Sequence, residues 1–180
     1  MFSFFRLSSF SLVFSFALFS LFSYSIFQRV NPWGLERGFV SYQKKEIAKH
    51  KTTPSKITIN SIAIDLPIVP STVKNGEFET TKKGISYLQS SAVPGDKGNT
   101  ILYGHNWPNL FGKLSRITPG DVVEVQLSNG SVARYSIVYT AKVTSDQVHI
   151  LNQTDDARIT LYTCTGLFDT KRFVAVGKLI

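Results

Sequence analysis

The chain has 180 residues, a formal net charge of +8 at pH 7, and 43% hydrophobic and 18% charged residues. Its single cysteine, Cys164, excludes an intrachain disulfide and a zinc site built from several cysteines. The basic residues form only short runs, such as Lys44-Lys45 and Lys82-Lys83, so they indicate a solvated cationic surface and no nucleic-acid partner. The same charge suits attraction to an anionic lipid surface or polymer.

A long uncharged segment precedes the rest of the chain. Residues 7–28 read LSSFSLVFSFALFSLFSYSIFQ, with Arg6 and Arg29 on either side. A helix of this length measures about 33 Å, enough to cross the hydrocarbon core of a bilayer. A cleaved signal peptide is the alternative, because Ser23-Tyr24-Ser25 resembles a small-x-small cleavage site. The apolar run exceeds the usual signal-peptide core, so we predict an uncleaved transmembrane helix within an anchor over residues 1–29.

A linker is predicted over residues 30–55. Pro32 and Gly34 end the membrane helix because proline removes a backbone donor and glycine is a poor helix former. Residues 35–50 have a weak amphipathic pattern that predicts a short helix, and residues 52–55 read as a loop.

Residues 56–180 change to short β-like runs and form the predicted folded domain. The runs are KITINSIAIDLPIV, NTILYG, DVVEVQLSNGSVARYSIVYTAKVT, ARITLYTC and KRFVAVGKLI. Asn129-Gly130 predicts a hairpin with a two-residue turn. Residues 76–93 are the least strand-like part and predict a short helical turn. Short strands at this density predict an all-β fold, either an antiparallel barrel or a sandwich.

Cys164 closes the run ARITLYTC, and Arg172 lies at the start of the next one. A lone cysteine is either a small buried hydrophobe or a nucleophile. If the two runs form a hairpin, Cys164 and Arg172 sit at the same end of neighbouring strands. A guanidinium there favours a thiolate and offers donors to a developing oxyanion, although an arginine at a strand end can also be merely solvated.

His105 is the histidine best placed for chemistry. It follows the apolar strand ILYG, whereas His50 lies in the linker and His149 in a polar stretch. Histidine shuttles protons near neutral pH, and a Cys/His pair is the minimal set for covalent acyl transfer. Spacing along the chain cannot bring His105 to Cys164, so the pair depends on the fold.

Several segments in order resemble the sortase family over nearly all of residues 57–180. SAVPGDKGNTILYGHN, residues 91–106, resembles the segment that leads to the family's catalytic histidine, and LFGKLSRITPGDVVEV resembles the segment after it. TLYTC, residues 160–164, matches the TLxTC signature, and KRFVAVGKL matches the strand that carries the family's arginine. Asn106 departs from the pattern, because an arginine commonly follows the histidine.

The resemblance implies a sortase-like eight-stranded β-barrel with short helical turns, preceded by the N-terminal transmembrane helix. It implies Cys164 as the nucleophile, His105 as the general acid and base, and Arg172 as the oxyanion or substrate clamp. Thr163, just before the cysteine, is expected to help shape the substrate groove.

The implied activity is that of a cysteine transpeptidase. Such an enzyme cleaves an LPXTG-like sorting signal in a surface protein through a thioester. It then passes the acyl group to an amine of the cell wall or of a pilin lysine. No cofactor is expected, because the thioester conserves the energy of the broken amide. No metal site is predicted, although calcium stimulation occurs in some sortases and stays open here. The acids available for it are Glu77, Glu79, Asp155 and Asp156, which have no ordered ligand spacing.

The family is typically held outside the cell membrane by an N-terminal segment, so the resemblance implies a single-pass protein with an extracellular catalytic domain. Contact with membrane lipid is then expected through the helix. The basic residues that follow the span argue against this orientation. Two further functions stay open. One is a membrane-tethered cysteine endopeptidase that uses water as acceptor. The other is a peptide-binding barrel without activity, which predicts that His105, Cys164 and Arg172 lie far apart.

Overall fold

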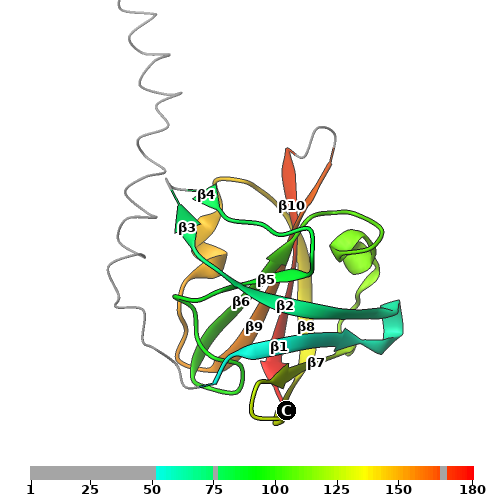
Figure 1. The fold of residues 1–180 in the computed structure, drawn as a ribbon. Coiled ribbons are helices and arrows are strands. Elements are labelled where there is room, and N and C mark those ends of the chain that lie inside the picture. The colour runs from blue at the N-terminus through cyan, green and yellow to red at the C-terminus, as the bar shows by residue number, and fades with distance from the viewer. Residues whose placement is uncertain (1–51, 75–76, 167–169) are drawn as a thin grey trace, which may run out of the picture. The chain divides into compact units, whose positions relative to one another are not determined.

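The computed structural model describes residues 52–74, 77–166 and 170–180 (Figure 1). The predicted anchor, and the linker up to residue 51, lie outside the described residues. Within the described ranges, no helix is both long enough and apolar enough to cross a membrane. The strands and 3-10 helices are, in order, β1 (Pro54–Ile59), η1 (Asn60–Ile62), β2 (Ile64–Ser71), β3 (Val73–Lys74), β4 (Glu77–Phe78), β5 (Ile85–Leu88), β6 (Gly98–Gly104), η2 (Phe111–Arg116), β7 (Val122–Leu127), β8 (Val132–Thr144), η3 (Val148–Leu151), β9 (Ala157–Thr165) and β10 (Lys171–Leu179).

Eight of these strands close into a barrel in the order β1-β2-β5-β6-β9-β10-β8-β7, and the β3–β4 pair forms a separate small sheet. The prediction of an eight-stranded β-barrel with short helical turns is therefore confirmed. Most neighbours pair antiparallel, but β2 with β5 and β6 with β9 are parallel. The barrel is thus mixed and not purely antiparallel. Strand β9 pairs with β6, although η2, β7, β8 and η3 lie between these two strands in the sequence.

Two local expectations need correction. The segment 77–93 contains strand β5 and no described helix, because β5 is buried along its whole length between β2 and β6 and therefore lacks an alternating pattern. The β7–β8 hairpin exists, but its loop is longer than two residues. The amide of Leu127 donates to the carbonyl of Ser131 at 2.8 Å, and Gly130 has a φ of +85°. This geometry is typical of a three-residue loop with a glycine in the left-handed region.

The barrel wall separates two apolar clusters. The inner cluster fills the barrel and includes Leu102 of β6, Leu161 of β9 and Phe111 of η2, each with no exposed surface. A smaller outer cluster joins Tyr103 of β6 and Tyr162 of β9 to Phe78 of β4 and to residues of η3. Successive side chains of a strand point to opposite faces. One stretch of wall is therefore covered on both sides, by the core within and by β3–β4 and η3 without.

Candidate active site

The parallel pairing of β6 and β9 brings His105 toward Cys164. Gly104 at the end of β6 pairs with Thr163 of β9, so His105 and Cys164, the next residues along the chain, lie at the same end of the strand pair. The antiparallel pairing of β9 and β10 sets Cys164 directly opposite Arg172. The predicted hairpin relation is confirmed, and the contact between the histidine and cysteine strands comes from a pairing that the sequence did not reveal.

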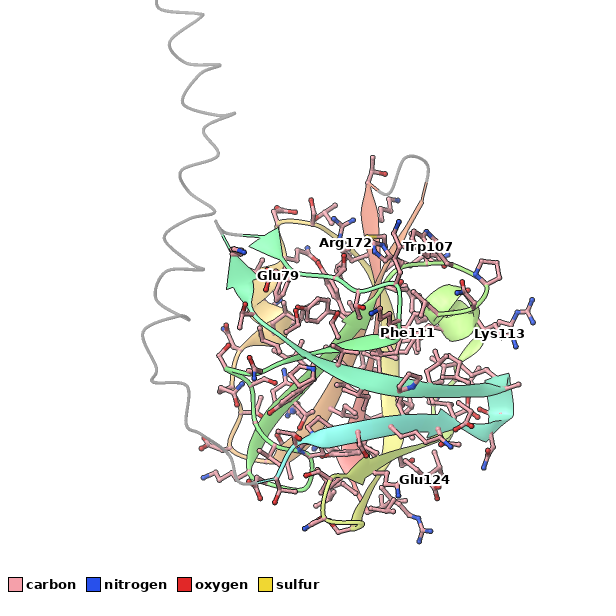
Figure 2. All side chains as sticks on the ribbon, in the orientation of Figure 1. Glu79, Trp107, Phe111, Lys113, Glu124 and Arg172 are labelled. Atoms are coloured by element: carbon pink, nitrogen blue, oxygen red, sulfur yellow. The ribbon has the colours of Figure 1, made fainter. Side chains whose placement is uncertain are left out.

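His105, Cys164 and Arg172 line one hollow of about 320 Å³, together with Thr163. In Figure 2, Arg172 and Trp107 both lie toward the end of the barrel at which β10 begins. The peptide-binding alternative predicted that the three residues are scattered, and this expectation is wrong. A thiol, an imidazole and a guanidinium around one hollow form a set that can carry out acyl transfer.

The hollow opens on the outer face of the wall. Tyr103 and Tyr162 belong to the outer cluster, and each precedes a site residue by two positions, so His105 and Cys164 continue the same face. Cys164, the single cysteine of the chain, is half-buried. Burial raises the pKa of the Tyr162 hydroxyl, while the charge and a hydrogen bond of Arg172 oppose that rise. The guanidinium therefore acts on the outer face, beside the thiol.

Phe78 of β4 and Thr80 just after it line one side of the hollow, and this part of the chain is tied to β6. The hydroxyl of Tyr103 lies 2.8 Å from both the Ser71 hydroxyl and the Glu79 carbonyl. The ring of Phe78, which also lines the hollow, packs against Tyr103 at 4.9 Å between ring centroids and against Tyr162 at 6.3 Å. Burial raises the pKa of Tyr103 to about 12, so the hydroxyl stays neutral at physiological pH.

Gly104 and Thr163 fix the backbone just before the two reactive residues. A Cβ at Gly104 would lie 3.0 Å from Cδ1 of Ile85, which explains why a glycine precedes His105 at this close approach. The Thr163 side chain is 2% exposed, and its hydroxyl donates to the Gly104 carbonyl at 2.8 Å. Thr163 thus joins β9 to β6 beside the hollow, and its contribution to substrate binding stays a prediction.

The remaining polar residues named from the sequence lie elsewhere. His149 is exposed on η3 and does not line the hollow. Glu79 pairs with Lys74, Asp155 with Lys97, and Asp156 with Arg158 and Lys178. Among the described residues, no three His, Cys, Asp or Glu side chains gather as metal ligands.

The sequence did not single out the aromatic residues that line or border the hollow. Phe78, Tyr103 and Tyr162 line it, and Trp107 stacks on the ring of His105. The sequence signal that could have found the two tyrosines is strand alternation, because Tyr103 stands two positions before His105 and Tyr162 two positions before Cys164. This signal becomes readable only once the outer face of the barrel is known to carry the site.

Comparison with known proteins agrees with this geometry. Residues 57–180 match the family model of the sortase domain. The chain is 30% identical over 148 residues to sortase A of Listeria monocytogenes, covering 79% of this chain and 61% of that protein. It is 28% identical over 134 residues to sortase A of Bacillus anthracis, covering 72% of this chain and 61% of that protein.

The chain therefore spans about 61% of the length of these curated relatives. The crystal structure of Listeria monocytogenes sortase A is 31% identical, with a TM-score of 0.57, and the match covers 70% of this chain and 86% of that one. Because the family model covers more than half of the residues, the chain belongs to the sortase family.

Proposed function

We propose that this protein is a cysteine transpeptidase with Cys164 as its nucleophile. The observation that carries the proposal is the shared hollow of His105, Cys164 and Arg172, formed by the ends of three neighbouring strands. The donor is a surface protein with an LPXTG-like sorting signal near its C-terminus. The acceptor is an amine of a cell-wall peptide or of a pilin lysine.

In the first half-reaction, Sγ of Cys164 attacks the threonine carbonyl of the signal, and its proton passes to the imidazole of His105. The guanidinium of Arg172 donates hydrogen bonds to the oxyanion of the tetrahedral intermediate. The carbon–nitrogen bond then breaks, and His105 delivers the proton to the departing glycine amine. A thioester to Cys164 remains, and the freed C-terminal fragment leaves.

In the second half-reaction, the acceptor amine attacks the thioester carbonyl and gives a proton to His105. The carbon–sulfur bond breaks, and the thiolate recovers the proton to restore the resting enzyme. The bond energy of the first amide is conserved in the thioester, so the scheme needs no ATP and no redox cofactor. Water in place of the amine would give hydrolysis, the endopeptidase alternative.

The anchor over residues 1–29 and the linker over residues 30–55 place the catalytic domain, residues 56–180, outside the cell membrane in this proposal. The support is the uncharged run over residues 7–28 together with the family's usual arrangement. A single membrane pass would hold the hollow near a substrate that is itself still in the membrane and near the cell wall beyond it.

The full chain in detergent should form a thioester adduct with a labelled peptide that carries an LPXTG-like signal, detected by intact mass. Added amines should then appear in the ligated product. Cys164→Ala should form neither adduct nor product, whereas Thr165→Ala, an alteration of the next strand position, should retain both. Cleavage by Cys164→Ala at the wild-type rate would refute the nucleophile. A hydrolysed peptide as the only product, with excess amine present, would favour the endopeptidase.

A further inference from the structure

The indole of Trp107 lies flat on the imidazole of His105. Their ring centroids are 4.3 Å apart, and the ring planes differ by 9°. Trp107 is 38% exposed, so its side chain contributes less to the core than a buried tryptophan would. A large aromatic side chain left at the surface, yet aligned this closely with a site residue, suggests a role in the site.

The backbone holds Trp107 in place over the imidazole. The amide of Phe111 donates to the His105 carbonyl at 3.1 Å, and the amides of Leu110 and Gly112 donate to the Trp107 carbonyl at 2.9 and 2.8 Å. Gly112 has to be glycine here, because a Cβ would lie 2.6 Å from the Trp107 carbonyl oxygen. Phe111 has no exposed surface. The loop that carries Trp107 is therefore fastened to the barrel core.

Lys82 approaches the same indole from the segment between β4 and β5. Its ammonium nitrogen lies 5.7 Å from the ring centroid, within the range of a cation–π attraction. Lys82 has no ion pair with any described residue, whereas Lys74, on the preceding hairpin, pairs with Glu79. The ammonium thus supports the indole from a second segment of the chain.

A general acid and base is usually oriented by a third group that hydrogen-bonds one of its ring nitrogens. Within the described part of the chain, the His105 ring has no hydrogen bond, and the acids Glu79, Asp155 and Asp156 are paired with cations elsewhere. A flat stack holds an imidazole by its face and leaves both nitrogens free at its edge. Proton transfer takes place at that edge, in the plane of the ring.

We propose that Trp107 is the positioning residue for His105, taking the place of the hydrogen-bonded third group. The stack limits rotation of the imidazole about its Cβ–Cγ bond, so that the nitrogen aimed at the hollow meets first the departing amine and then the incoming one. This inference rests on the proposed function, because it concerns the proton transfers of His105 with the departing and the incoming amine. It adds a residue to the site that neither touches the thiol nor lines the hollow.

The test compares Trp107→Phe, Trp107→Leu and Asn109→Ala, the last being an exposed residue of the same loop with no described side-chain contact. Each is assayed with two donors of one sequence, a peptide with the scissile amide and a peptide in which a thioester replaces that amide. A departing amine needs a proton, whereas a departing thiolate does not. His105 takes the thiol proton of Cys164 with either donor, but it gives a proton only to the departing amine. A loss of positioned proton transfer therefore costs more with the amide than with the thioester.

With the amide, Trp107→Leu should lower kcat by roughly tenfold or more, a part of what general acid catalysis supplies, with KM within about twofold. Trp107→Phe keeps an aromatic face and should lose much less, and Asn109→Ala should match the wild type. With the thioester, release of the thiolate by Trp107→Leu should fall by a clearly smaller factor than release of the amine does with the amide. Equal losses on both donors, or a rise in KM alone, would overturn the proposal. Equal losses would indicate that Trp107 has a structural role, and a rise in KM alone would indicate that it contacts substrate.

A second measurement needs no substrate. In the wild-type protein, NMR signals of the His105 ring protons should be shielded by the indole, and Trp107→Leu should remove the shielding while the unfolding temperature stays close to that of Asn109→Ala. Unshielded protons in the wild type would end the proposal. The proposed function fails separately, if Cys164→Ala forms an adduct or cleaves either donor as the wild type does.

Discussion

Asn99 is expected to hold the outer layer of the site to the barrel. It has no exposed surface, and its side-chain amide donates to the carbonyls of Ile150 and Asn152, each at 3.2 Å. Its side-chain oxygen accepts from the buried hydroxyl of Thr160 at 2.8 Å. These three bonds fasten η3 and the residues after it to β6 and β9. The perturbation that tests them is Asn99→Ala.

The expected loss follows from the bonds. Each internal hydrogen bond contributes about 1 kcal/mol net, so removing three lowers the free energy of unfolding by about 3 kcal/mol. The loss in free energy of unfolding is larger than this if the Thr160 hydroxyl stays buried without a hydrogen-bond partner. For a domain of this size, 1 kcal/mol shifts the unfolding temperature by about 3–4 °C, so Asn99→Ala should unfold roughly 10 °C lower.

Thermal unfolding followed by circular dichroism measures this shift. Asn152→Ala is the matched control, because its exposed side chain has no described hydrogen bond and its carbonyl, which accepts from Asn99, is retained. Ile150 and Leu151 pack in the outer cluster with Tyr162, so Asn99→Ala should also raise KM for the donor peptide. The reasoning is refuted if Asn99→Ala unfolds within about 3 °C of wild type, or no lower than Asn152→Ala.

Three further predictions concern pH and packing. The pKa of Tyr103 is raised to about 12, so from its ordinary value of 10 upward only the unfolded tyrosine ionises and the free energy of unfolding falls. Urea unfolding at pH 9 to 11 should show a smaller fall for Tyr103→Phe, and an identical fall would contradict this. Arg158 holds the pKa of Asp156 well below its ordinary 3.8, so the stabilisation present above that pH is lost as pH falls below it. Asp156→Asn should then show a shallower decline of unfolding temperature in acid, and an equally steep decline would count against the pair. Gly104→Ala presses a Cβ against Cδ1 of Ile85, costing about 1–3 kcal/mol and displacing His105, and Ile85→Val should partly restore kcat by removing that methyl group. No recovery in the double variant would refute the packing explanation.

The parts of this fold that the sequence predicted well are local. Alternating and apolar runs marked most strands, and the short connection between Cys164 and Arg172 predicted their hairpin. The register confirms it, with the two residues directly opposite each other. The hairpin around Asn129-Gly130 was also found, although its loop is one of three residues. Each of these features depends on neighbours within about a dozen positions, so the sequence alone contains the necessary information.

What the sequence could not predict depends on distant pairings. The parallel contact of β6 with β9 joins residues 59 positions apart in sequence, such as Gly104 and Thr163, and no periodicity signals it. Strand β5 lacks an alternating pattern because neighbours cover both of its faces. The stack of Trp107 on His105 arises from a loop whose shape is set by hydrogen bonds to η2. For the His105–Cys164 pair, only the family resemblance anticipated the result.

One stretch of wall supports both the fold and the site, because alternation sends its residues to opposite faces. On β9, Leu161 enters the core, whereas Tyr162 and Cys164 face the hollow. A slip of one residue between β9 and β6 would turn the thiol into the barrel. The bond from the Thr163 hydroxyl to the Gly104 carbonyl opposes such a slip at the position just before the reactive pair. Thr163 therefore has a structural role that does not require contact with substrate. It keeps Cys164 on the same face of the wall as His105 and Arg172.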